Sequence, residues 1–171
     1  MAVHPQNGAS ITWRRLSAAD AEALWELENA CFSLPWSLEQ LRGIFSQKAF
    51  AALGHFGQRG LDAYISVYQA ADELEILNLA VLPALRRRGI GRALLLSALQ
   101  TGGKMGMQKA WLEVRAGNSP AIRLYESCGF CRAGIRPGYY PDTGEDGLIY
   151  SCQLCLFTPR ANLENKRCEK S

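Results

Sequence analysis

The pattern of apolar and polar positions divides the chain into alternating strands and helices. Short runs rich in apolar and β-branched residues predict seven strands, and apolar residues spaced three and four apart predict four helices. The expected strands cover residues 11–16, 49–56, 61–70, 73–81, 110–114, 130–136 and 148–156, and the expected helices start near residues 17, 37, 89 and 119. This order predicts a mixed α/β layer in which helices cover a sheet.

Local signals predict where the helices begin and end. Serine followed three residues later by an acidic residue or glutamine is typical of a capping box, serine before proline is typical of a helix start, and glycine is typical of a helix end. The starts are marked by Ser17 with Asp20, Ser37 with Gln40 and Ser119 with Pro120, and the ends by Gly102-Gly103 and Gly129.

Length and composition favour one domain. A chain of 171 residues that is 48% hydrophobic can bury one good core. We expect the domain to cover residues 9–157, with polar, disordered termini at 1–8 and 158–171. The net charge of +3, from 19 basic and 16 acidic residues, neither demands nor excludes an anionic partner.

The sequence also limits the location and partners of the protein. It contains no apolar run of about 20 residues, the length of a membrane span, and it does not begin with a secretion signal. We therefore expect a cytoplasmic monomer that does not contact membranes. No motif indicates nucleic-acid binding.

Six cysteines include two Cys-x-x-Cys pairs, one at Cys128 and Cys131 and the other at Cys152 and Cys155. Two such pairs about twenty residues apart have a spacing found in zinc ribbons. The second pair lies in an apolar run that predicts a strand, where residues three apart face opposite sides. We therefore expect reduced cysteines that act as small hydrophobic residues, with no metal and no disulfide.

The segment from Val81 to Leu94 carries the strongest chemical signal, because a strand enters a helix there through a basic, glycine-containing turn. Helix N-termini present free N–H groups, and glycine lets the backbone approach a phosphate closely. The segment lacks the third glycine of a Rossmann site and the Gly-Lys-Ser or Gly-Lys-Thr of a Walker loop. What remains is the pattern Arg86-x-x-Gly89-x-Gly91, in a turn where a pyrophosphate would fit.

This loop resembles the acetyl-CoA pyrophosphate loop of the GNAT N-acetyltransferases. Within that superfamily, residues 111–130, 32–37 and 136–141 are similar to the RimI-type ribosomal protein alanine N-acetyltransferases. The resemblance covers residues 11–156. It implies the GNAT acyl-CoA N-acyltransferase fold, a mixed central sheet of about seven strands with helices on both faces. The implied reaction moves the acetyl group of acetyl-CoA to the N-terminal alanine of a small-subunit ribosomal protein.

Acetyl transfer to an amine needs a base, since an α-amine with a pKa of about 7.7–8.0 must lose a proton before it attacks a thioester. Glu113 lies in the otherwise apolar strand 110–114, where a carboxylate is costly unless it is paired, hydrated or functional. Tyr125, late in the fourth helix, could protonate the departing thiolate. The resemblance implies these same roles. The alternatives are an outward-facing strand carboxylate and a tyrosine that only packs in the core.

The resemblance also implies binding residues. Backbone groups of the strand before the loop would contact the acetyl group and pantetheine, and Asn118 would hydrogen-bond the pantetheine arm or merely set a turn. The implied cofactor-binding residues are Leu79, Ala80, Val81, Arg87, Arg88, Gly89, Ile90, Gly91, Arg92 and Asn118. The implied acceptor-binding residues are Trp36, Tyr139 and Tyr140, of which the tyrosines could instead only pack at a strand end.

Two other functions stay open at this stage. A GNAT enzyme that acetylates small-molecule amines or lysine side chains would keep the cofactor motifs and change the acceptor loops. The segment Tyr139-Tyr140-Pro141 argues against it. A non-catalytic CoA-binding or zinc-stabilised interaction domain is the other alternative, and the presence of both Glu113 and Tyr125 argues against that one.

Overall fold

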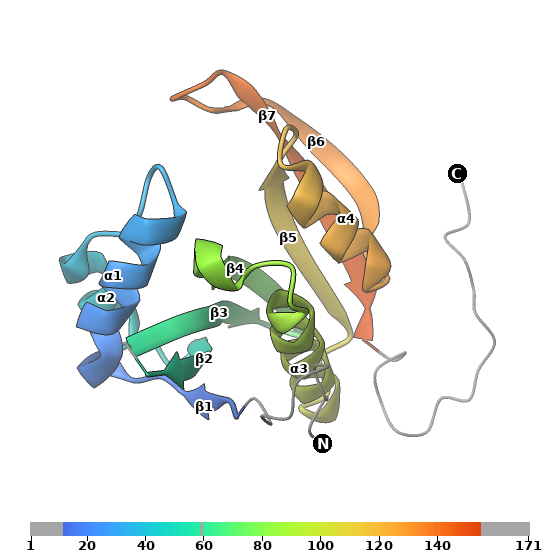
Figure 1. The fold of residues 1–171 in the computed structure, drawn as a ribbon. Coiled ribbons are helices and arrows are strands. Elements are labelled where there is room, and N and C mark those ends of the chain that lie inside the picture. Colours follow the sequence, from blue (N-terminus) through green and yellow to red (C-terminus); the bar gives the residue numbers. More distant parts are fainter. Residues whose placement is uncertain (1–11, 59, 155–171) are drawn as a thin grey trace. The chain divides into compact units, whose positions relative to one another are not determined.

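The computed structural model describes residues 12–58 and 60–154 (Figure 1). The order of its strands and α-helices is the order that the sequence predicts, with two short 3-10 helices in addition. The strands are β1 (Arg14–Arg15), β2 (Phe50–Gly57), β3 (Gly60–Ala70), β4 (Glu73–Val81), β5 (Lys109–Arg115), β6 (Cys131–Tyr140) and β7 (Glu145–Gln153). The helices are η1 (Ala18–Asp20), α1 (Ala21–Cys31), α2 (Leu38–Ile44), η2 (Pro83–Leu85), α3 (Ile90–Lys104) and α4 (Ser119–Ser127). The predicted polar termini lie outside the described residues.

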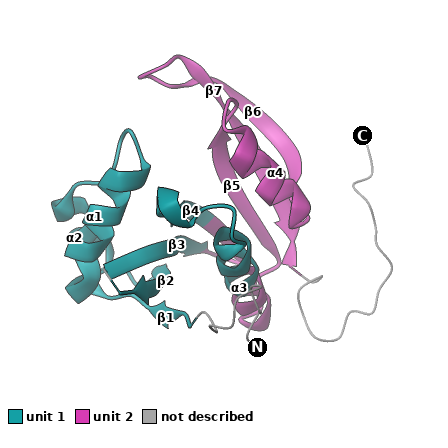
Figure 2. Cartoon of the chain, in the orientation of Figure 1, with its two compact units in different colours: residues 1–69, 76–98 teal, residues 70–75, 99–171 magenta. Residues whose placement is uncertain are grey.

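The strands form one seven-stranded sheet in the order β1-β2-β3-β4-β5-β7-β6, so the mixed α/β prediction is confirmed. The last strand, β7, lies between β5 and β6 and runs antiparallel to both. The chain divides into two compact units, residues 1–69 with 76–98 and residues 70–75 with 99–171 (Figure 2). That a single domain covers residues 9–157 stays a prediction.

The first unit is built around β2 and β3. In β3, four consecutive residues from Ala63 to Ser66 are buried, which requires that both faces of the strand be covered. Helices α1 and α2 cover one face through an apolar cluster that includes Leu24, Leu27 and Leu41. The first turns of α3, in the same unit, bury Leu94 and Leu95 completely and supply further core.

Both predicted capping boxes are confirmed. The Ser17 N–H donates to the Asp20 carboxylate at 2.9 Å. At the start of α2, the Ser37 N–H donates to Gln40 Oε1 at 2.8 Å, and the Gln40 N–H donates to Ser37 Oγ at 3.1 Å. These bonds satisfy N–H groups that a helix start would otherwise leave without an acceptor.

The predicted end of the third helix at Gly102-Gly103 is wrong, because α3 continues to Lys104. A Cβ atom on Gly102 would lie 3.0 Å from the Leu74 side chain and 3.3 Å from that of Leu154. This glycine therefore allows close packing within the second unit. The helix ends instead near Gly106, whose φ of +88° suits glycine.

The predicted cap of the fourth helix is also wrong by one residue. Asn118 is the N-cap of α4, and its Oδ1 accepts a hydrogen bond from the Ala121 N–H at 3.3 Å. The predicted end at Gly129 is confirmed, since its φ is +91° and the following Phe130 N–H donates to the Tyr125 carbonyl at 3.1 Å.

The cysteines differ in part from the prediction. Cys131 is disulfide-bonded, so the expectation of reduced cysteines without a disulfide is wrong, whereas Cys31 and Cys152 carry free thiols. Position 155 lies outside the described ranges. Within residues 12–58 and 60–154, no three His, Cys, Asp or Glu side chains gather as a metal site would require. Over the same residues, every helix is too short or too polar to span a bilayer.

We predict that Asp20 makes stability depend on pH in the acid range. Arg14 donates two hydrogen bonds to this carboxylate, which lowers its pKa to about 2. Because the pKa is lower in the folded chain than in the unfolded chain, the stabilisation is complete above about pH 4 and lost as the pH falls toward 2. Urea unfolding should show wild type more stable than Asp20→Asn by about 1 kcal/mol at pH 6, allowing for solvent screening. If the difference in the free energy of unfolding between wild type and Asp20→Asn did not shrink between pH 4 and pH 2.5, the prediction would be contradicted.

Candidate active site

The strands of the second unit present two different faces. Alternate residues of β5 are buried, Ala110, Leu112 and Val114 among them, so Glu113 points to the opposite face. Leu112 pairs with Tyr150 of β7, whose hydroxyl donates to Glu126 of α4 at 3.0 Å. Helix α4 therefore covers the face that carries Leu112, and Glu113 lies on the other face.

Glu113, the predicted base, is held by two neighbours. Its Oε1 lies 2.9 Å from Arg136 Nε in an ion pair, and its side chain is 16% exposed. The Tyr139 hydroxyl forms a hydrogen bond with the same carboxylate, and this bond and burial raise the pKa of Tyr139. Glu113 is therefore part of a polar network with Arg136 and Tyr139, one of the predicted acceptor tyrosines, and is not an isolated outward-facing carboxylate.

A second carboxylate in this network escaped the sequence prediction. Partial burial raises the pKa of Glu75 on β4, the negative charge of Glu113 raises it further, and Arg136 lowers it. In the sequence, Glu73 and Glu75 alternate with Leu74 and Ile76, the pattern of an ordinary half-exposed strand. Only the strand order, which puts β4 beside β5, could have indicated that Glu75 lies near Glu113.

An irregular stretch of β6 brings Tyr139 to this network. Between the pairs Arg136–Gly147 and Tyr140–Glu145, β6 contains residues 137–139 while β7 contains only residue 146. Such bulges change the face on which the following side chains lie. Gly138 adopts a φ of +60° there, and its N–H donates to Asp146 Oδ1 at 2.8 Å.

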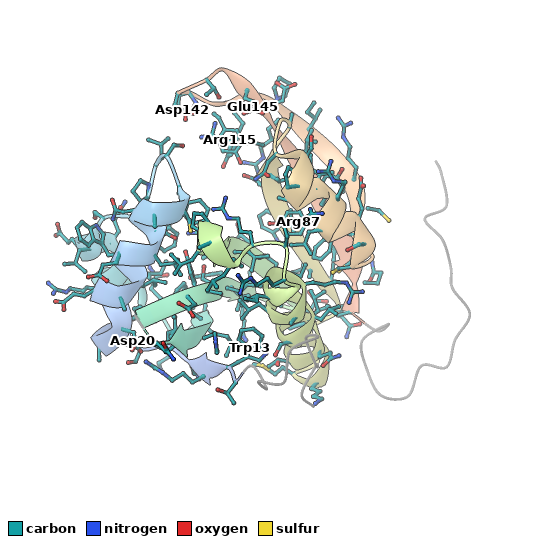
Figure 3. All side chains as sticks on the ribbon, in the orientation of Figure 1. Trp13, Asp20, Arg87, Arg115, Asp142 and Glu145 are labelled. Carbon is teal, nitrogen blue, oxygen red and sulfur yellow. The ribbon has the colours of Figure 1, made fainter. Side chains whose placement is uncertain are left out.

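Tyr140 is held by a cluster around Arg115, the last residue of β5. The guanidinium lies 3.9 Å from the centre of the Tyr140 ring and donates to both carboxylate oxygens of Asp142, at 3.0 and 2.9 Å. Glu145 accepts a hydrogen bond from the Gly117 N–H. Figure 3 shows Arg115, Asp142 and Glu145 together near the end of the β6–β7 hairpin. This cluster ties the turn of the hairpin to the segment that follows β5.

Tyr125, the predicted acid, is a buried residue of α4. Its side chain is 8% exposed and its ring centre lies 5.9 Å from that of Phe130. Burial, followed by the influence of Tyr140, raises the pKa of Tyr125 to about 12. The phenol therefore keeps its proton at neutral pH. Tyr125 thus packs as a core tyrosine would, and the influence of Tyr140 on its pKa shows that it also lies near one of the predicted acceptor tyrosines.

The predicted pyrophosphate loop lies in the first unit. The Ala93 N–H donates to the Gly89 carbonyl at 3.0 Å, so the N–H groups of residues 90–92 precede this bond in the first turn of α3. Arg87 has a φ of +65° and Gly89 a φ of +80°, which makes this a sharp turn (Figure 3 labels Arg87). The side chains of residues 87, 88 and 92 are exposed. The loop has the features of an anion site.

Hydrogen bonds already made constrain two of the implied cofactor contacts, and burial constrains a third. The Val81 carbonyl accepts from Arg86 Nε at 3.0 Å and from the Cys31 thiol at 3.5 Å, which favours the N–H of Val81 for a ligand. Ala80 is buried, so its side chain belongs to the core as expected. The Oδ1 atom of Asn118 caps α4, which leaves its amide Nδ2 as the better candidate for a pantetheine contact.

The predicted acceptor residues fall into two sets, one in each unit. In the first unit, the Trp36 indole is partly buried against the core cluster, with its ring centre 6.5 Å from that of Phe50. In the second unit, Tyr139 is 42% exposed and touches Tyr140, with ring centres 5.2 Å apart. The second unit thus brings together Glu113, Tyr125 and both tyrosines of the predicted acceptor site.

Comparison with known proteins identifies the class. Residues 21–130 match the acetyltransferase (GNAT) family, and the chain belongs to that family as an N-acetyltransferase. It is 35% identical over 143 residues to the ribosomal protein bS18-alanine N-acetyltransferase of Salmonella typhimurium, a match that covers 82% of this chain and 96% of that protein.

Solved structures agree with this assignment. The ribosomal-protein-S18-alanine N-acetyltransferase from Escherichia coli has a TM-score of 0.78 and 32% identity, over 90% of this chain and 99% of that one. The PaiA N-acetyltransferase from Thermoplasma acidophilum, solved in complex with coenzyme A, has a TM-score of 0.73 and 25% identity, over 85% of this chain and 99% of that one.

We predict that Gly147 is required for the position of Tyr139. A Cβ atom on Gly147 would lie 3.0 Å from Tyr139 Cδ1 and 3.1 Å from Cγ, so Gly147→Ala should push the ring away. A double-mutant cycle with Tyr139→Ala, measured by urea unfolding, cancels the general effect of replacing glycine. We expect a coupling free energy of about 1 kcal/mol. Additive effects of the two substitutions would show that the ring does not lie over Gly147.

Proposed function

We propose that this protein transfers the acetyl group of acetyl-CoA to a protein N-terminal α-amine, namely the N-terminal alanine of a small-subunit ribosomal protein. The observation that carries the proposal is the network of Glu113, Arg136 and Tyr139, in which the proposed base is bonded to a tyrosine proposed to bind the acceptor. The names of the relatives support the same substrate. A ribosomal substrate implies that the protein acts in the cytoplasm. We still predict a monomer that binds neither nucleic acid nor membranes.

Each unit contains candidate cofactor-binding residues. In the first, the free N–H groups at the start of α3 (Ile90, Gly91 and Arg92) would hold the pyrophosphate, and the exposed side chains of Arg87 and Arg88 would add charge-assisted bonds. The backbone from Leu79 to Val81 would contact the acetyl carbonyl and pantetheine. In the second, Asn118 would donate from Nδ2 to the pantetheine arm.

The reaction would need proton movements at two stages. Glu113 would accept the proton of the α-amine, directly or through a water molecule, and the free amine would attack the thioester carbonyl. As the tetrahedral intermediate collapses to the amide and expels the CoA thiolate, its nitrogen would lose a second proton, and the thiolate would take up one proton and leave as the thiol. A phenol with a pKa of about 12 is a weaker acid than a thiol with a pKa of about 8.5, so Tyr125 would first stabilise the thiolate by a hydrogen bond.

In the second unit the acceptor peptide would lie against Tyr139 and Tyr140, and in the first unit the candidate acceptor residue is Trp36. The exposed ring of Tyr139 is available to a ligand, while its hydroxyl is bonded to Glu113. A peptide backbone that contacts this tyrosine therefore brings its first residue close to the proposed base. This proximity suits an α-amine, which has no long side chain between the reacting nitrogen and the backbone.

We predict selective turnover of a free N-terminal alanine. CoA release should be measured with acetyl-CoA and two peptides, one with a free N-terminal alanine and no lysine, the other N-formylated with one internal lysine. The α-amine peptide should have a kcat/KM at least about 100-fold higher, in part because a lysine with a pKa of about 10.4 is far more protonated at pH 7.5. Mass spectrometry should place the acetyl group on the alanine. Equal turnover, or turnover of small amines alone, would overturn the assignment.

A further inference from the structure

The first unit contains a buried carboxylate for which the proposed reaction has no use. Glu28, near the end of α1, is 1% exposed. Its carboxylate accepts hydrogen bonds from the Tyr64 hydroxyl of β3, from Asn78 Nδ2 of β4 at 2.9 Å, and from the Trp36 N–H at 3.1 Å. Over residues 12–58 and 60–154, Glu28 takes part in no ion pair.

A contribution to stability does not by itself explain why a carboxylate is buried at position 28. Removing a carboxylate from water is costly, and apolar residues of similar volume often replace buried ionic groups without loss of stability. Burial accordingly raises the pKa of Glu28, while its three hydrogen bonds lower it in part. The three donors come from three separate segments of the chain, so the carboxylate fixes those segments to one another.

Two of these segments belong to the proposed active site. Trp36 lies in the link between α1 and α2, residues 32–37, which we call the acceptor segment. Asn78 directly precedes Leu79, the start of the backbone stretch proposed to contact the acetyl group. A single side chain thus holds the acceptor segment to the strand that would hold the acyl group.

The two carboxylate oxygens of Glu28 accept hydrogen bonds from different segments of the chain. Oε1 accepts from Tyr64 and Asn78, the two donors on the sheet. Oε2 accepts from the Trp36 N–H of the acceptor segment. The contact with the sheet and the contact with the acceptor segment can therefore be changed separately by substitution.

We propose that Glu28 is a positioning residue, which fixes the acceptor segment against β4 and thereby sets the affinity for the acceptor peptide. It acts through Trp36 and does not touch the substrate. The inference rests on the proposed function, in which the acceptor segment binds the peptide.

The test compares Glu28→Gln with Tyr64→Phe. In Glu28→Gln the amide oxygen can replace Oε1 toward the sheet, but the NH₂ group then faces the Trp36 N–H and two donors oppose each other. Tyr64→Phe removes one donor to Oε1 and leaves the Oε2 bond intact, so it is the matched control. Urea unfolding of both variants reports whether they fold.

We expect Glu28→Gln to raise the KM for the alanine peptide about tenfold or more, the effect of one lost bond to a charged group, with the KM for acetyl-CoA changed less than about twofold. Tyr64→Phe should change both KM values less than about twofold, whatever its stability. An unchanged peptide KM in Glu28→Gln, a parallel rise in the KM for acetyl-CoA, or an equal effect of Tyr64→Phe would overturn the proposal.

Amide hydrogen exchange of the wild type gives a second readout that needs no variant. The Trp36 N–H should exchange much more slowly than that of exposed Leu34 in the same segment, since it is bonded to a buried acceptor. If the Trp36 N–H exchanged as fast as the Leu34 N–H, the proposal would be overturned even if Glu28→Gln does not fold. Wild-type enzyme that shows this protection but does not turn over the peptide would refute the proposed function and not the anchoring of the segment.

Discussion

The register of β5, β7 and β6 is the constraint on which the candidate active site depends. Because side chains alternate along a strand, a shift of one residue in β5 would turn Glu113 toward α4 and expose Leu112. The buried side chains on the α4 face fix this register. They thereby hold a carboxylate on the opposite face, where Arg136 and Tyr139 bind it.

The hairpin of β6 and β7 is shaped around the same carboxylate. Three residues of β6 stand opposite one of β7, and Gly147 leaves room for the Tyr139 ring beside them. Arg115, two residues after Glu113, ties the turn of the hairpin back to the end of β5. The proposed base and the proposed acceptor tyrosines are therefore positioned by one continuous set of bonds within the second unit.

Local sequence signals predicted the order of the elements, both capping boxes and the place of Glu113 on its strand, because each depends on residues close in sequence. They failed where distant residues decide. Gly102 lies within α3 where Leu74 and Leu154 approach its backbone closely, and the burial of Glu28 depends on segments up to fifty residues away. The family resemblance supplied the roles of the site residues, which no periodicity could give.

The central claim, that Glu113 takes the proton of the amine, is tested most directly by the pH dependence of kcat/KM. Wild type and Glu113→Gln should be compared with the alanine peptide from about pH 6 to pH 9.5, across the pKa of about 7.7–8.0 of the α-amine. Without its base the variant depends on amine that is already deprotonated. The account therefore predicts a ratio of wild type to variant that is largest at pH 6 and falls as the pH rises past 8. A ratio that stays constant across this range would contradict it.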